Sequence, residues 1–345
     1  MKKKRKIIIL CGVLLSLFSL SLSSFGQLSS FGQKTQIRGF VDALTTLQDK
    51  KITFGFGEQD LFISSELSDR FSFLGESVFK FDTTSSTNFS VSVERVIIKY
   101  NYYGNHNILI GKHHTPVNYW NDTYHHGRVF FPTIDRPLLF AANIIPLHTV
   151  GISFQGSNLG NVKFGYDLMV GNGLGSEDVF ENDKRKSVTA AVHIKPADGL
   201  RFGVSWYNDE MAAGTKTHDG KLINWAVKQN LFTGSVAYFG QRFELLTEST
   251  FGSNHTDTTG TKQTVASYIY AGVRIKDKIV PYVRFDRLHF QEGEILFDKN
   301  NTTSIIGGIR YEFSYLIVAK LEYQNLHSDA KTDVNKLTFQ LAVGF

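Results

Sequence analysis

The sequence is poor in cysteine, in proline and in long apolar runs, and each shortage excludes a class of protein. Its single cysteine, Cys11, lies near the N-terminus, so the rest of the chain has no thiol for a disulfide or for cysteine chemistry. Only 6 residues are proline, whereas 29 are Phe and 14 are Tyr, which favours strands over disorder. The mean hydropathy of −0.14 excludes a bundle of membrane-spanning helices but not a membrane barrel, in which only alternate residues face lipid.

The net charge of +5 comes from one end of the chain. Five of the 37 basic residues lie within residues 2–6, and the remaining 32 balance 32 Asp and Glu residues. Without this end the chain is close to neutral, so its charge gives no reason to expect nucleic acid as a partner.

Residues 1–26 have the pattern of a secretory signal peptide. The basic stretch MKKKRK precedes the apolar stretch IIILCGVLLSLFSLSL, and the small residues Ser24 and Gly26 precede a cut before Gln27. The repeated SSFGQ offers an alternative cut after residue 32. A membrane anchor is the other interpretation, but the apolar run is short and small polar residues follow it directly. We expect residues 33–345 to form a single domain.

The rest of the chain alternates between apolar and polar residues, which is the pattern of strands. In the final segment, KLTFQLAVGF, every second residue is apolar and the last of them is Phe345. We expect about sixteen strands, near residues 35–46, 51–66, 70–82, 88–103, 106–113, 147–156, 161–172, 187–196, 199–210, 222–239, 242–253, 263–275, 278–291, 302–313, 315–327 and 335–345.

Short and long connections between these strands alternate along the chain. The short ones are rich in Gly, Asn and Asp, as tight turns require, and the longer polar ones include QDKK, SNHTDTTGTKQ and SDAKTDVN. This rhythm is typical of outer-membrane barrels, in which short turns face the periplasm and longer loops face outward. Lipid offers no hydrogen-bond partner, so the last strand must close the sheet against TQIRGFVDAL near its start. The sequence therefore predicts an all-β fold, a transmembrane antiparallel β-barrel.

The signal peptide, the loop rhythm and the terminal Phe345 together resemble a Gram-negative outer-membrane β-barrel porin. More narrowly, residues 90–117 resemble the early hairpin of the phosphate-selective porin O/P family, in which an Arg-bearing strand and a GK…P strand lead into the constriction loop. The residues that fit this pattern are Arg95, Gly111, Lys112 and Pro116. The resemblance implies an outer-membrane location, contact with outer-membrane lipid and recognition of the terminal strand by the barrel-assembly machinery, and it allows a homotrimer.

The longest connection, residues 113–147, is apolar and aromatic in a way that exposed loops are not. Its aromatic residues include Tyr119, Trp120, Phe130 and Phe131. Loops of this length are usually functional, and these side chains need a place to be buried. We expect this third external loop to fold into the lumen and narrow the pore, as in the porins that the chain resembles. The alternative is packing over the mouth or against a neighbouring protomer.

The polar residues of this loop are candidates for the pore constriction. They are His113, His114, Asp122, His125, His126, Arg128, Asp135 and Arg136. Four histidines invite a metal site, but adjacent histidines on a strand point in opposite directions and no pair has i, i+4 spacing. We expect no metal and no cofactor, and we expect the histidines to titrate near neutral pH and to alter conductance.

If the apolar residues face lipid, the alternate polar residues line the lumen. The candidates for the pore wall are Arg38, Asp42, Lys80, Arg95, Lys163, Arg201, Arg284, Asp286, Arg310, Glu312, Lys320 and Glu322. Charged rings filter ions by sign, so basic wall residues opposite Asp122 and Asp135 would form a selective constriction. A simple hydrated interior is the alternative. Around Arg95, the stretch VERVIIKY loses strict alternation, so its facing is ambiguous.

These expectations describe a porin, a passive channel for small hydrophilic solutes or ions. A closed barrel with a structural or adhesin-like role is one alternative, and an outer-membrane barrel enzyme of the lipase type is another. The sequence contains no nucleophile elbow, P-loop or HExxH motif, so we expect no enzyme activity.

Overall fold

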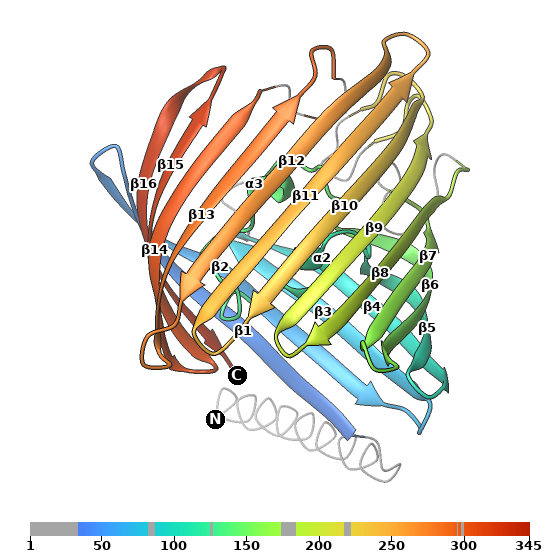
Figure 1. Cartoon of the computed structure of the whole chain (residues 1–345), viewed down its shortest axis with the longest axis horizontal. Helices are drawn as coiled ribbons and strands as arrows, with labels where there is room; N and C mark the ends of the chain where they lie inside the picture. The colour runs from blue at the N-terminus through green and yellow to red at the C-terminus, as the bar shows by residue number, and fades with distance from the viewer. Residues whose placement is uncertain are drawn as a thin grey trace, which may run out of the picture.

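In the computed structural model, the alternating segments pair in chain order and form one closed antiparallel barrel (Figure 1). The structure describes residues 34–81, 87–124, 127–173, 184–216, 222–294, 296–297 and 300–345, so the predicted signal peptide lies outside the described residues and stays a prediction. The prediction of about sixteen strands is confirmed. They are β1 (Lys34–Gln48), β2 (Lys51–Glu66), β3 (Phe71–Phe81), β4 (Phe89–Tyr103), β5 (His106–His114), β6 (His148–Leu159), β7 (Phe164–Gly171), β8 (Ser187–Ala197), β9 (Leu200–Met211), β10 (Val227–Phe239), β11 (Phe243–Thr256), β12 (Gly260–Val273), β13 (Ile279–Phe290), β14 (Thr302–Ser314), β15 (Ile317–Ser328) and β16 (Lys331–Gly344).

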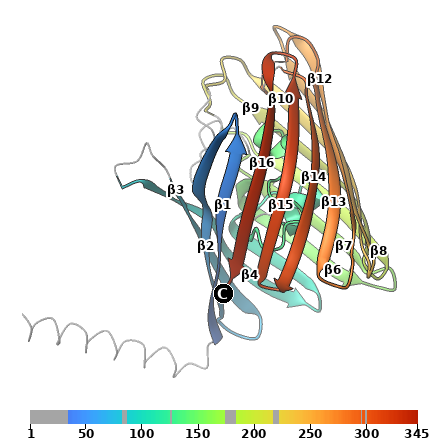
Figure 2. The same cartoon turned by 90° about the vertical axis from the view of Figure 1, so that its left-hand side faces the viewer.

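The first and last strands close the barrel. β1 and β16 lie side by side, with Phe40 opposite Gly344 at one end of their register (Figure 2). Just beyond this register, the backbone groups of Gly39 and Phe345 exchange two hydrogen bonds of 2.9 Å. A Cβ atom built on Gly39 would lie 2.4 Å from the Phe345 ring, so the ring fits because residue 39 has no side chain. This contact joins the two ends of the sheet, as closure in a lipid environment requires.

A β-bulge explains the irregular alternation around Arg95. In the pairing of β3 with β4, Glu76 is opposite Arg95 and the residue after Glu76 is opposite Val93, so Glu94 is an extra residue. Before the bulge the odd-numbered Val93 is exposed, whereas after it the even-numbered Val96 is exposed. The bulge therefore turns both Glu94 and Arg95 toward the lumen.

The connections at one end of the barrel are all short turns, but several at the other end are shorter than predicted. The expected loops QDKK, SNHTDTTGTKQ and SDAKTDVN are tight turns at residues 49–50, 257–259 and 329–330. Asp49 and Lys50 have positive φ angles of 49° and 64°, the conformation of a type I′ hairpin turn. Most residues of these polar segments are strand ends that pair with the neighbouring strand, so a polar sequence alone does not indicate a loop. The connection before β10 is instead longer than predicted, because β10 begins at Val227 rather than near residue 222.

The connection between β5 and β6, which we call the constriction loop (residues 115–147), folds into the barrel as predicted. It carries two short helices, α2 (Tyr119–Thr123) and α3 (Leu138–Ala141), which lie within the ring of strands in Figure 1. Among the described residues, no helix is long and apolar enough to cross a bilayer. The loop divides the interior into a packed side and an open side.

Candidate pore constriction

The constriction loop forms an apolar core with one side of the barrel wall. Its residues Val117, Trp120, Phe131 and Ile144 are each at most 1% exposed. They belong to one cluster with inward-facing residues of β9 to β14, among them Tyr268. Burial of such side chains contributes about 1.5–3 kcal/mol each, so apolar packing alone holds the loop firmly against this side.

Cationic wall residues bind carbonyl groups of the loop. The Nζ atom of Lys320 donates hydrogen bonds to the carbonyl oxygens of Arg128 and Thr133 at 2.6 and 3.2 Å. Arg284 donates to the carbonyl oxygen of Asp135 at 2.6 Å. Lys320 and Arg284 are each only 1% exposed, so these bonds form away from water, where an unmet carbonyl group is costly.

Acidic wall residues bind N–H groups of the same loop. Glu322 accepts a hydrogen bond from the backbone of Ile134 at 3.0 Å, and Asp286 accepts one from Leu138 at 3.1 Å. Glu248 accepts from the first two N–H groups of α2, which have no partner within the helix. The wall thus recognises the loop through its backbone, with cations on carbonyl groups and carboxylates on N–H groups.

Arg310 joins the loop to a buried carboxylate on the wall. Its Nη2 atom lies 2.7 and 2.9 Å from the two carboxylate oxygens of Glu244, and its Nη1 atom donates to the carbonyl oxygen of Pro132 at 3.2 Å. Its Nε atom donates to Glu312 at 2.9 Å, and Arg274 pairs with both glutamates. Arg310 is therefore fixed on every side by charged or polar partners.

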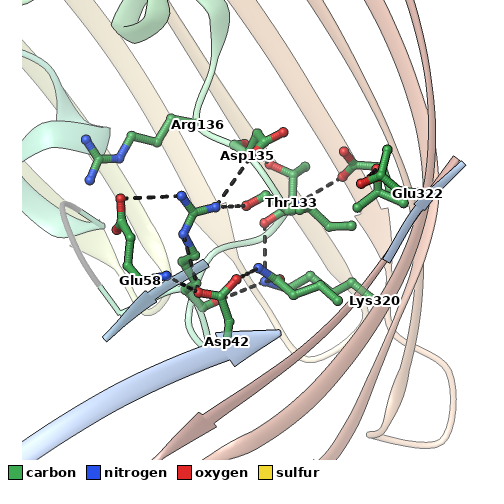
Figure 3. Close-up of polar contacts among 12 residues, drawn as sticks. Asp42, Glu58, Thr133, Asp135, Arg136, Lys320 and Glu322 are labelled. Atoms are coloured by element: carbon green, nitrogen blue, oxygen red, sulfur yellow. Dashed lines mark hydrogen bonds and ion pairs between the residues drawn. The ribbon is translucent and has the colours of Figure 1, made fainter. Parts of the chain in front are cut away.

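Arg128 of the loop is the centre of a second group of ion pairs, and its partners Asp42, Glu58 and Asp135 are labelled in Figure 3. Its guanidinium nitrogens lie 3.7 Å from Asp42, 3.5 Å from Glu58 and 3.4 Å from Asp135. Burial acts to lower the pKa of Arg128, but the carboxylates of Glu58 and Asp42 raise it above its ordinary value. In Figure 3, Asp42 lies between Glu58 on its left and Lys320 on its right.

Asp135 and Arg136 of the loop also lie among charged partners. Asp135 is 3.0 Å from Lys336 on β16. Burial acts to raise the pKa of Asp135, but Lys336 and Arg128 hold it below its usual value. Burial lowers the pKa of Arg136, although the nearby Glu58 acts in the opposite direction.

Seven of the predicted pore-wall residues therefore either contact the constriction loop directly or bind another residue that contacts it. This group is Asp42, Arg284, Asp286, Arg310, Glu312, Lys320 and Glu322. Their side chains face the interior, as alternation predicts, but the loop covers them. Their charges hold the constriction in place, and a solute in open water does not meet most of them.

Open space remains on the other side of the loop. A cavity of about 540 Å³ lies between Tyr119 and Asp122 of the loop and the wall formed by β6 to β10. The wall residues there include several small side chains: Ala191, Gly203, Ser205, Thr233 and Ser235. On the packed side the inward positions carry tyrosine, arginine and leucine instead. Side-chain size thus decides which half of the lumen the loop fills and which half stays open.

Three of the predicted site residues line this cavity: Asp122, Lys163 and Arg201. The Nη2 atom of Arg201 lies 3.1 Å from a carboxylate oxygen of Asp122. The guanidinium group of Arg201 also stacks over the ring of Tyr119, 4.8 Å from its centre. Lys163 lies 3.3 Å from Asp198, near the end of the barrel with short turns. These contacts place both signs of charge along one passage.

The remaining predicted wall residues lie elsewhere. Lys80 pairs with Glu58 at 3.3 Å, and Arg95 pairs with the buried Glu76. Arg38 is exposed on the part of β1 that precedes its pairing with β16. The structure does not bring these three cations together with Arg201.

Two of the four histidines predicted for the constriction, His113 and His114, lie at the end of β5, directly before the constriction loop. His113 is buried at the end of β5, and His114 is opposite His148, with their ring centres 5.4 Å apart. The ring of His148 is 3.2 Å from Glu94. His125 and His126 lie outside the described residues. Within the described part of the chain, no group of three or more His, Cys, Asp or Glu is arranged to hold a metal ion.

Several residues of the site are absent from the predicted set, among them Glu244, Glu248 and Lys195. In the stretch FELLTEST, Glu244 lies between the apolar Phe243 and Leu245, which is a period-two signal, but polar residues surround Glu248 and give no such signal. Lys195 follows His193 on the same face of β8, beside a turn, and it too lines the cavity. Alternation therefore indicates that Glu244 and Lys195 face inward, but it does not give their partners.

Comparisons with solved structures find the same fold in outer-membrane proteins. The chain is similar to an anion-selective porin from Comamonas acidovorans, with a TM-score of 0.67 and 11% identity over 91% of this chain and 100% of that one. It is similar to OmpF of Salmonella typhi in complex with daunomycin, with a TM-score of 0.65 and 12% identity over 92% and 99%. It is also similar to the trimer form of OmpT, an outer membrane protein of Vibrio cholerae, with a TM-score of 0.64 and 13% identity over 91% and 99%.

At these identities the likenesses show the fold alone. No family model matches the sequence, and no curated protein matches it. The narrower resemblance to the phosphate-selective porin O/P family therefore stays a prediction. The fold is that of the Gram-negative outer-membrane β-barrels, porins among them.

Proposed function

We propose that the chain is a porin, a water-filled channel for the passive diffusion of small hydrophilic solutes or ions. The cavity between the constriction loop and the wall of β6 to β10 supports this proposal. This half of the barrel lumen is open, whereas the loop packs tightly against the wall in the other half. Charged and small polar side chains on both of its sides keep such a space hydrated. Solutes would pass between Asp122 on the loop and Arg201 on the wall.

Single-channel recording in planar bilayers tests the proposal. We expect stable ohmic current steps from the purified protein. The reversal potential in unequal KCl concentrations then reports whether cations or anions pass more easily. A protein that is folded in the bilayer but gives no current would instead support a closed barrel with a structural or adhesin-like role.

The proposal assigns no chemical reaction to the chain. An assay of lipid hydrolysis by the purified protein tests this part. Hydrolysis that disappears when a single Ser or His is replaced would support a barrel enzyme instead.

We further propose that the barrel resides in the outer membrane of a Gram-negative bacterium, surrounded by outer-membrane lipid. The outer face supports this, since large apolar residues are exposed on strands all around the barrel. The terminal strand is then the segment that the barrel-assembly machinery reads, with Phe345 as its last residue. Removing Phe345 should lower the amount of assembled barrel in the outer membrane while leaving synthesis unchanged.

A homotrimer is the assembly that we propose. On β2, Phe54 and Phe56 are 81% and 71% exposed, more than other outward phenylalanines, and a second copy would cover them. One similar structure is described as a trimer form. Chemical cross-linking in membranes should give a band of three subunits, and replacing both phenylalanines with serine should weaken it.

A further inference from the structure

We propose that the channel favours small zwitterions, solutes that carry one ammonium and one carboxylate group several ångströms apart, as in a short peptide. This inference rests on the proposed channel function. The cavity beside the constriction loop carries it, because it contains a lysine without an ion pair and a carboxyl group whose partners are neutral.

The charges around the cavity are balanced. Three cations and three carboxyl groups line it: Lys163, Lys195, Arg201, Asp122, Asp167 and Asp198. A channel that selects ions by sign needs an excess of one charge, which this lining does not have. Two of the possible pairs are formed, Arg201 with Asp122 at 3.1 Å and Lys163 with Asp198 at 3.3 Å. Lys195 and Asp167 remain.

Neither Lys195 nor Asp167 forms an ion pair within the described part of the chain, although the charge of Lys195 acts on Asp122 from a longer distance. The backbone of Lys195 is fixed by a hydrogen bond to the carbonyl oxygen of Val162 at 2.8 Å, while its ammonium group has no ion pair. Asp167 accepts hydrogen bonds from the hydroxyl of Ser153 and the side-chain amide of Gln155, which are both neutral. Each group can therefore attract an opposite charge from a solute.

The spacing of the two groups suits a solute longer than a single amino acid. On β7 and β8, Asp167 is opposite Ala191, which is four residues from Lys195. Four residues of strand span about 13 Å, and the long lysine side chain can shorten the distance between the charges. The two charges of an amino acid are too close together to reach both groups. The termini of an extended di- or tripeptide are far enough apart.

Swelling of liposomes that contain the purified full chain tests this inference with four forms of dialanine. The free dipeptide is a zwitterion, N-acetyl-dialanine is an anion, dialanine amide is a cation, and N-acetyl-dialanine amide is neutral. We expect the zwitterion to enter faster than the neutral form by roughly two- to fivefold, the range that weak charge pairs in water provide. We expect Lys195→Met and Asp167→Asn each to reduce this ratio toward one.

Lys228→Met is the matched control. Lys228 is exposed on β10 between two buried neighbours and does not line the cavity, so its replacement should leave the ratio unchanged. A zwitterion that enters no faster than the neutral form, or an anion that enters fastest, would overturn the inference and leave the channel intact. If none of the four peptides enters although the purified protein conducts ions, the inference fails and the channel stands, whereas a protein that also conducts no ions would overturn both.

Discussion

The Nη2 atom of Arg201 on the barrel wall lies 3.1 Å from a carboxylate oxygen of Asp122 on the constriction loop, beside the open cavity. The contacts of Arg310 are of a different kind, because they are buried and are directed at a backbone carbonyl group of the loop and at Glu244 on the wall. Wall charges therefore have two roles: some hold the loop and others face the passage. The same substitution, Arg to Glu, should therefore change ion selectivity in one group and stability in the other.

Replacing Arg201 with Glu should shift the ion selectivity of the channel toward cations. The change alters the local charge by two units beside Asp122, at a position that lines the cavity. Stability should change little, by at most about 1 kcal/mol, because partly exposed ion pairs contribute little. The reversal potential in unequal KCl measures the shift, and Arg201→Lys, which keeps the charge, is the control. An unchanged reversal potential would place the passage elsewhere.

Replacing Arg310 with Glu should instead prevent stable folding. The new carboxylate would face Glu244 and Glu312, which would keep Arg274 as a partner but lose Arg310. Loss of one partner from a buried ion pair costs about 3–5 kcal/mol. Unfolding in denaturant, followed by the mobility shift of the folded barrel on gels, measures the effect. A variant that folds normally and changes only its ion selectivity would show that Arg310 faces the solute.

Replacing Lys320 with Met should loosen the constriction loop. Two loop carbonyl groups would lose their donor, and each buried group left without a partner costs about 1–3 kcal/mol. We expect noisier single-channel currents and faster proteolysis within the loop, with the barrel itself retained. Lys228→Met, on the outer face, should do neither. If the Lys320 variant gives currents as quiet as those of the wild type, apolar packing alone is enough to hold the constriction loop.

The strands could be predicted from the sequence because each residue of a membrane strand faces one of two solvents. Lipid outside and polar groups inside impose alternation, which remains visible wherever the pairing is regular, as on β16. The signal fails where register shifts. At Glu94 a bulge reverses which residues of β4 face inward, the odd-numbered or the even-numbered ones. Only the pairing with β3 shows that Glu94 and Arg95 both face inward.

The partners of the inward charges could not be predicted in the same way. Alternation places Arg284, Lys320 and Arg201 on the lumen side, but it gives no information about what crosses the lumen. The loop contacts join residues far apart in sequence, such as Lys320 and Thr133, and many of them involve backbone groups that every sequence has. A feature that the sequence does contain is side-chain size. Small residues such as Ala191 and Gly203 mark the half of the wall that the loop leaves open.

Replacing Gly57 with Ala should destabilise the barrel, whereas the same change at Gly55 should not. A Cβ atom at Gly57 would lie 2.1 Å from the carboxylate of Asp42, which is held by the backbone of Glu58 and the amide of Gln340. Crowding of this kind costs about 1–3 kcal/mol. A Cβ atom at Gly55 meets nothing within 4 Å. Denaturant unfolding of the two variants compares them, and equal stabilities would mean that the Asp42 side chain moves freely.

Acidification should release the part of the loop that Asp135 holds. Its carboxylate is 3.0 Å from Lys336, and although burial acts to raise the pKa of Asp135, Lys336 and Arg128 hold it below its usual value. A group whose pKa is lowered on folding stabilises the anchored loop at pH values above its ordinary pKa of about 4, and the stabilisation is lost as the pH falls through the lowered value. Current noise should therefore be constant from pH 7 to 5 and should rise below about pH 4. In Asp135→Asn this acid-induced rise should be smaller, with noise already higher at pH 7, and an identical pH profile in the variant would assign the transition to another group.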